Sequence, residues 1–282
     1  MDEINQKHRK KSKFEIKFWG YSIWRITAYF IIYSIGGYLT ETLFGILTKG
    51  VLESRQSMLY GPFCCIYGIG AITLICMPKQ FKKTKWTLFW AGVIYGSIVE
   101  YLVSWIGDCY FHMKWWDYSN LAFNINGRIC LIFSIFWGLL AICLNRVINP
   151  IVDKWINKIP EKVLKITVAI IFAFLVIDVI ISSFALKMFF TRLIHNYHLG
   201  VIGADSYYQQ YLDMYQNNEK IKNIVDKYFS DKKMIEIFPN VKVTLKDGNV
   251  ILVRDILKDI KPYYLRIFTP KNIGNIDLLT DY

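Results

Sequence analysis

The sequence lacks the signatures of the commonest enzyme classes. Gly-x-Ser-x-Gly, His-Glu-x-x-His and the phosphate-binding Gly-x-x-x-x-Gly-Lys-Ser/Thr are all absent. These absences argue against a serine hydrolase, a zinc protease and a nucleotide-binding domain of the usual kinds. We therefore expect no catalytic residues and no enzymatic activity, and we expect any ATP that the protein uses to bind on another chain.

Paired metal ligands are also lacking. The chain has six cysteines, of which Cys64 and Cys65 are adjacent, and none shows the spacing of a structural zinc site. His112 stands without other ligand-type residues in a metal-binding pattern. We expect no metal and no cofactor, and we interpret the cysteines as small apolar side chains, with a disulfide between outer-end cysteines as the open alternative.

Charge is scarce, whereas apolar residues are abundant. Charged residues make up 20% of the chain and hydrophobic residues 54%. The apolar residues gather in runs of about 20, the length that crosses a bilayer. Five runs predict five transmembrane helices, at residues 26–48, 59–78, 86–106, 129–148 and 166–190.

The net charge of +12 is unevenly distributed. Segments 7–17, 79–85 and 146–165 carry fifteen Lys and Arg residues, against four in segments 49–55 and 114–128. This alternation follows the positive-inside rule, so it predicts a multi-pass protein of the cell membrane with a cytoplasmic N-terminus. The partner of the basic residues is then the lipid bilayer, and we expect no nucleic acid.

Three regions differ in composition. Residues 1–23 form a basic, aromatic cytoplasmic or interfacial segment, residues 24–190 the membrane domain, and residues 191–282 a polar domain predicted to be extracytoplasmic. In the last region, 205–229 resembles one charged amphipathic helix, and Asp247-Gly248 lies between two strand-like runs and predicts a hairpin. The fold class is thus an all-α membrane protein followed by a small α+β tail.

Two of the predicted spans carry the same spacing of small residues around a glutamate. Gly37 and Glu41 lie in the first, Gly96 and Glu100 in the third, and a spacing of four places each pair on one helix face. Gly-x-x-Cys then opens the second and fourth spans. We interpret spans one to four as two parallel hairpin repeats followed by a fifth helix, with chance matching of small residues as the alternative.

The carboxylates in the spans are the candidate functional residues, because charges inside a bilayer are costly and usually face the protein interior. Glu41 and Glu100 lie at similar depths, and Arg128 enters the membrane near the same level. We predict that these three form one cluster whose excess negative charge is met by a proton or a cation. Asp178, in the middle of the fifth span, is a fourth candidate without an evident partner. The alternative is that all four only hold helices together.

The third loop is dense in aromatic and polar side chains. We predict a polar lid over the bundle, and the alternative is ordinary anchoring at the membrane interface. The candidate lid residues are Trp115, Trp116, Asp117, Tyr118 and Asn124.

Several motifs carry a family resemblance over about residues 30–155. They are Tyr60-Gly61-Pro62, Tyr67-Gly68, Glu100-Tyr101, Trp115-Trp116-Asp117-Tyr118 and Asn124-x-x-Gly127-Arg128. With them the chain resembles the ABC-transporter type IV permease family, also called CmpB-like. The resemblance implies a permease of the bacterial cytoplasmic membrane.

Two functional readings remain open at this level. The first is a permease-like subunit for a small solute or ion, with a separate ATPase subunit as partner. The second is a non-transporting scaffold or regulator whose tail binds a partner, and a membrane-embedded enzyme is a third, weaker reading. Self-association into a homo-oligomer is compatible with either of the first two.

Overall fold

The described part of the chain is mostly helical, with four helices long and apolar enough to cross a membrane and small strands in its C-terminal region. The structure, a computed structural model, describes residues 17–257, 259–260 and 265–268, without the side chains of 205 and 206. Most of the predicted N-terminal basic segment lies outside the described residues. The long helices are Ile23–Lys49 (α2), Lys85–Phe111 (α4), Leu131–Ile156, and Glu161–Tyr197 (α7). At 1.5 Å per residue, each exceeds the roughly 30 Å of a hydrocarbon core.

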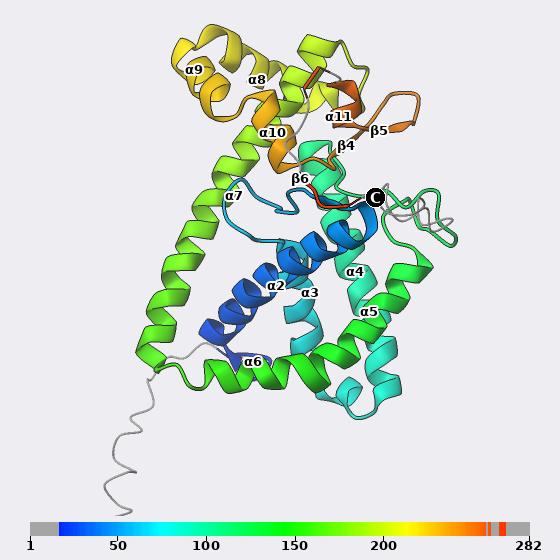
Figure 1. The fold of residues 1–282 in the computed structure, drawn as a ribbon, viewed down its shortest axis with the longest axis vertical. Helices are drawn as coiled ribbons and strands as arrows, with labels where there is room; N and C mark the ends of the chain where they lie inside the picture. The colour runs from blue at the N-terminus through cyan, green and yellow to red at the C-terminus, as the bar shows by residue number, and fades with distance from the viewer. Residues whose placement is uncertain (1–16, 258, 261–264, 269–282) are drawn as a thin grey trace, which may run out of the picture.

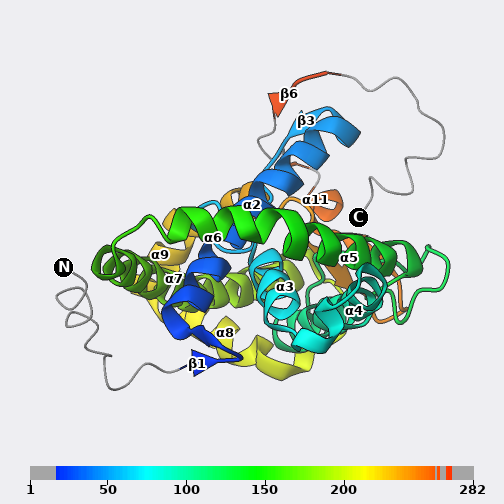
Figure 2. The same cartoon turned by 90° about the horizontal axis from the view of Figure 1, so that it is seen from below.

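The helix Leu131–Ile156 has three parts. It begins as α5 (Leu131–Cys143), passes through a π-helical turn (η2, Leu144–Ile148), and ends as α6 (Asn149–Ile156). Seen from below, α5 and α6 form one band across that end of the molecule (Figure 2). Asp153 on α6 binds Arg25 on α2 at 2.8 Å, and Tyr33 donates to Asn149 at 3.0 Å. These contacts fasten the start of α2 to the end of the α5–α6 band.

The predicted second span is wrong as a continuous helix. Only Cys65–Cys76 (α3) is helical, and its 12 residues extend about 18 Å, too short to cross a bilayer. Gly61 adopts a φ of +79° and Pro62 follows it, so the residues before α3 cannot continue a helix. The chain nevertheless returns to the lower end through this non-helical segment and α3, and α4 rises from there beside α3 (Figure 1).

The shorter elements lie at the ends of the long helices. Strands β1 (Lys17–Phe18) and β2 (Tyr21–Ser22) precede α2, and the 3₁₀ turn η1 (Lys79–Lys82) precedes α4. Thr84 caps α4, with its side chain accepting from the Thr87 N–H. After α2, β3 (Val51–Leu52) pairs antiparallel with β6 (Leu265–Arg266), so a loop of the membrane region pairs with a strand of the tail.

The tail contains helices and a hairpin, as predicted, but its first helix is divided. Residues 204–228 form α8 (Ala204–Asn217) and α9 (Glu219–Tyr228), because Asn218 leaves helical geometry and its side chain caps α9. Helix α10 (Asp231–Ile237) follows. The predicted hairpin is confirmed: β4 (Lys242–Thr244) pairs with β5 (Val250–Leu252), with Gly248 at positive φ in the turn. Helix α11 (Val253–Ile256) continues directly from β5.

The predicted boundary at residue 190 falls inside α7. This helix continues to Tyr197, and its upper part, Ala185–Leu193, shares a hydrophobic core with Val225, Met234 and Val253 of the tail. Arg192 near the end of α7 binds Asp231 at 2.7 Å. The tail therefore folds onto the end of α7 (Figure 1), and its core is not separate from the membrane region.

Candidate intramembrane polar site

Glu41 lies on α2, where it faces α3. The Tyr67 hydroxyl of α3 donates a hydrogen bond to Glu41 Oε1 at 2.5 Å. One turn before Glu41, Gly37 lies directly beneath the Tyr67 side chain, and a methyl group there would approach ring atom Cδ2 to 2.6 Å. The small residue thus makes room for the aromatic ring whose hydroxyl reaches the glutamate.

Glu100 has the same arrangement on α4, facing α5. The indole Nε1 of Trp137 donates to Glu100 Oε2 at 3.0 Å. A methyl group on Gly96, one turn earlier, would lie 2.5 Å from Trp137 Cβ. Tyr118 supplies a second donor to Glu100 Oε1, also at 3.0 Å, and Glu100 is only 5% exposed.

The two glutamates have partners of the same kind. No ion pair among the described residues includes Glu41 or Glu100; their partners are neutral hydroxyl and indole groups. A carboxylate in this position can accept a proton or contribute a ligand to a cation, because no basic side chain neutralises it.

Arg128 does not join the two glutamates as predicted. Its guanidinium binds Asp108 at 2.6 Å and Ser104 at 3.3 Å. Helix α4 runs to Phe111 rather than ending at 106, so Asp108 is helical and shares a face with Ser104 and Glu100 at spacings of four. Asp108 lies about 12 Å further along the helix axis than Glu100. Arg128 pairs with Asp108 and not with Glu100.

Asp178 has partners that the sequence did not reveal. It lies on α7 with 1% exposure and accepts the Tyr60 N–H at 3.2 Å and the Ser182 hydroxyl at 3.0 Å. The Ser182 oxygen in turn accepts the Leu59 N–H at 2.8 Å. Asp178 and Ser182 therefore supply acceptors to the non-helical backbone before α3, which has no water to bind if it lies at membrane depth.

The five predicted lid residues build the loop between α4 and α5. Only Tyr118 bonds directly to a candidate carboxylate. Asn124 accepts the Gly127 N–H at 3.1 Å, and Trp116 donates to the Arg128 carbonyl at 3.0 Å, so both order the loop itself. Asp117 accepts from Ser119 at 2.7 Å, and Trp115 packs against Gly107 and Phe111. The lid itself stays a prediction.

The residues that sequence reasoning missed are the aromatic donors and the true partner of Arg128. Tyr67 follows Cys64 of the first Gly-x-x-Cys by three residues, and Trp137 follows Cys130 of the second by seven. Because these positions differ, aligning the two motifs does not reveal them. The available signal is a Tyr or Trp, which carries a neutral hydrogen-bond donor, in the helix that follows each Gly-x-x-x-Glu.

Arg128→Leu is expected to destabilise the protein, because it leaves the Asp108 carboxylate without its partner. Asp108 and Arg128 are partly exposed, so we expect a coupling energy of about 1–3 kcal/mol. Asp108→Asn should recover part of the loss in the double variant, whereas Glu100→Gln should add to it independently. The measurement is thermal unfolding in detergent of the singles and both doubles. A coupling of Arg128 to Glu100 larger than its coupling to Asp108 would contradict the observed pairing.

The fold and site define a multi-pass membrane protein with a hydrogen-bonded glutamate inside each of two helix pairs. Residues 28–183 match the family model described as "Putative ABC-transporter type IV", and this match covers more than half of the chain. The chain therefore belongs to that family. The match includes all four candidate charged residues and the predicted lid, and ends before the tail. No curated protein and no solved structure matches the chain.

Proposed function

We propose that the chain is a permease-like membrane subunit that handles a small solute or ion, with ATP hydrolysed by a separate ATPase subunit. The observation that carries the proposal is the pair of glutamates, Glu41 and Glu100, held by neutral donors inside the membrane region. A charged side chain at the bilayer centre costs about 2.5–3.5 kcal/mol on the insertion scale, so the presence of such groups in the spans favours a role in binding or transfer of charge. Membership of an ABC-transporter family supports the same reading.

The two helix pairs support a parallel-repeat architecture for this subunit. In each, a rising helix carries Gly-x-x-x-Glu, and the next helix begins after a cysteine and supplies the aromatic donor. α2 and α4 both begin at the lower end of the molecule (Figure 1). We infer that the pairs are two copies of one hairpin whose glutamate faces meet at the solute-handling centre.

We predict a cytoplasmic N-terminus, with the tail on the outer side. Lys83 and Asn249 are both exposed and lie at opposite ends of the protein, so accessibility reports the side of the membrane rather than burial. Cysteines introduced at these positions are treated in intact cells with a thiol reagent that cannot cross the membrane. Position 249 should label and position 83 should not; the reverse pattern would reverse the orientation.

The proposed function is tested by comparing the contents of cells. Wild-type protein and the double variant Glu41→Gln/Glu100→Gln are produced at equal membrane abundance, and cellular ions and small solutes are quantified by mass spectrometry. At least one ion or solute should differ between the two. The matched control Asp213→Asn, in the exposed part of α8, should behave as wild type. If the wild type and the double variant give the same profile of ions and solutes, the proposed permease function is wrong.

A scaffold is the second candidate function. It is favoured by the charged groups that have structural partners: Arg128 with Asp108, Asp178 with the backbone of Tyr60, and Arg192 with Asp231. In a scaffold, the glutamates also serve only to fix α3 and α5. Unchanged cell contents, together with a binding partner that depends on the tail, would support it.

A further inference from the structure

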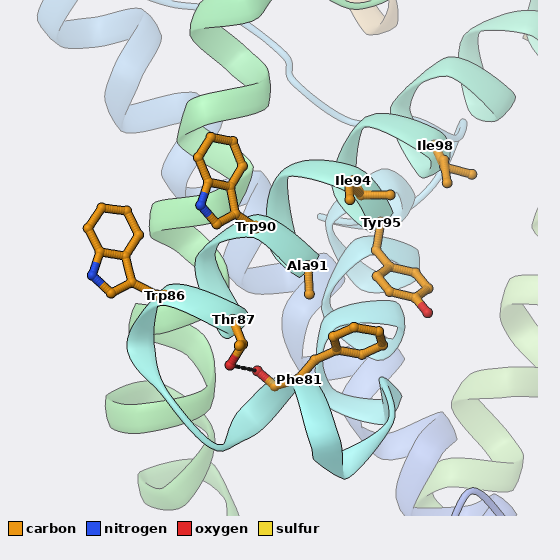
Figure 3. A pocket seen from close by; sticks show the side chains of 8 residues that line it. All are labelled: Phe81, Trp86, Thr87, Trp90, Ala91, Ile94, Tyr95 and Ile98. Atoms are coloured by element: carbon orange, nitrogen blue, oxygen red, sulfur yellow. Dashed lines mark hydrogen bonds between the residues drawn. The ribbon is translucent and has the colours of Figure 1, made fainter.

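An apolar groove of about 500 Å³ lies on the outer side of α4 near its start. Figure 3 shows Phe81 and Tyr95 on one side of it, Trp86 and Trp90 on the other, and Ile94 and Ile98 further along the helix. The Phe81 and Tyr95 rings meet edge to face at 6.0 Å, and the Thr87 hydroxyl is turned to the Phe81 carbonyl at 3.0 Å. The exposed lining of the groove is therefore mostly carbon, and the Thr87 hydroxyl already has an acceptor.

The lower end of the groove is strongly basic. Lys79, Lys83 and Lys85 are exposed and lie within two residues of the lining residues Phe81 and Trp86. None has an acidic partner among the described residues, and the sequence has no Asp or Glu between Glu53 and Glu100. The positive charge here has no local compensation.

The start of α4 adds to the positive electrostatic potential at the lower end of the groove. Its first turn contains no acidic residue, and the Thr84 cap accounts for the N–H groups of Thr87 and Leu88. The N–H groups of Lys85 and Trp86 precede those capped positions, and the first N–H groups of a helix lack partners within it. A helix N-terminus with flanking lysines favours a phosphate group.

We propose that this groove binds one anionic phospholipid, with an acyl chain along Trp90, Ile94 and Ile98 and the headgroup phosphate at Lys79, Lys83 and Lys85. The charge of the lysines selects an anionic over a zwitterionic headgroup. Trp86 and Trp90, 73% and 56% exposed, flank the chain at the level where indole rings prefer to lie. The site is separate from Glu41 and Glu100, so it stands or falls independently of the proposed transport function.

The test uses full-length protein in mild detergent, titrated with phosphatidylglycerol or phosphatidylcholine and observed by native mass spectrometry. Wild type should retain one phosphatidylglycerol more strongly than phosphatidylcholine. The triple variant Lys79→Gln/Lys83→Gln/Lys85→Gln should lose this preference. Its apparent affinity for phosphatidylglycerol should fall roughly 100-fold, because each basic residue near an anionic surface contributes about 1 kcal/mol.

A matched control separates a built site from general attraction. Lys154→Gln/Lys158→Gln/Lys162→Gln removes the same charge from α6, the turn after it and the start of α7, and all three lysines are exposed. It should keep the preference, whereas Ile94→Trp, which fills the groove at an exposed position, should weaken retention of both lipids. Equal retention of the two lipids by wild type, or equal losses in both triple variants, would overturn the proposal.

Discussion

Asp178→Ala is expected to destabilise the protein by about 2–5 kcal/mol. The substitution removes the acceptor of the Tyr60 N–H and of the Ser182 hydroxyl, at a residue that is 1% exposed. Each buried donor left without a partner costs roughly 1–3 kcal/mol. The backbone before α3 should then loosen first, because Asp178 and Ser182 fasten it to α7.

Thermal unfolding in detergent measures this loss, and hydrogen exchange at residues 57–64 locates it. Asp178→Asn is the informative partner variant, since its amide oxygen can still accept one of the two bonds and should restore part of the stability. Asp213→Ala, on the exposed side of α8, controls for loss of a carboxylate. If Asp178→Ala unfolds like Asp213→Ala, then the contacts of Asp178 do not hold this segment.

Two neighbouring glycines are expected to respond to alanine with opposite signs. Gly37→Ala should cost about 1–3 kcal/mol, because its methyl group would overlap the base of the Tyr67 side chain, which cannot move without α3. Gly36→Ala should stabilise α2 by up to about 1 kcal/mol, because nothing lies within 4 Å of the added carbon and alanine favours the helix.

The same measurement tests the close approach of α2 and α3. Displacing Tyr67 also lengthens its 2.5 Å hydrogen bond to Glu41. Once Gly37→Ala has weakened this bond, adding Glu41→Gln should cause little further loss of stability, so the two effects should be less than additive. Gly96→Ala, against Trp137, should behave like Gly37→Ala. Equal effects of Gly36→Ala and Gly37→Ala would show that the two helices are not in the observed contact.

Hydropathy was sufficient for four of the five predicted spans. Their long apolar runs allow only a helix in a bilayer, and the helices extend past the predicted limits because amphipathic ends such as Ile106–Phe111 add turns beyond the apolar core. The second run failed because hydropathy does not distinguish a helix from a buried irregular segment. Gly61-Pro62 was visible in the sequence, but the acceptors that satisfy the interrupted backbone come from α7, more than 100 residues away.

The polar site was predictable in its residues and not in its pairings. The spacing of four places Gly37 with Glu41, and Gly96 with Glu100, on one face, and both glycines pack against a side chain of the next helix. The partner of Arg128 depends on the last turns of α4, since ending the helix at 106 places Asp108 in a loop and hides its alignment with Glu100. The donors Tyr67 and Trp137 depend on how far each following helix is rotated, which the sequence spacing does not fix.

The most direct test of the functional proposal is purification of the tagged full-length protein in mild detergent with quantitative mass spectrometry of what accompanies it. An ABC-type permease subunit should bring an ATPase chain in near-stoichiometric amount, absent when an unrelated multi-pass protein is purified in the same way. The Glu41→Gln/Glu100→Gln variant should retain this partner, because the proposed solute centre lies within the membrane region. A stable, monodisperse protein that brings no ATPase would contradict the permease proposal and favour the scaffold.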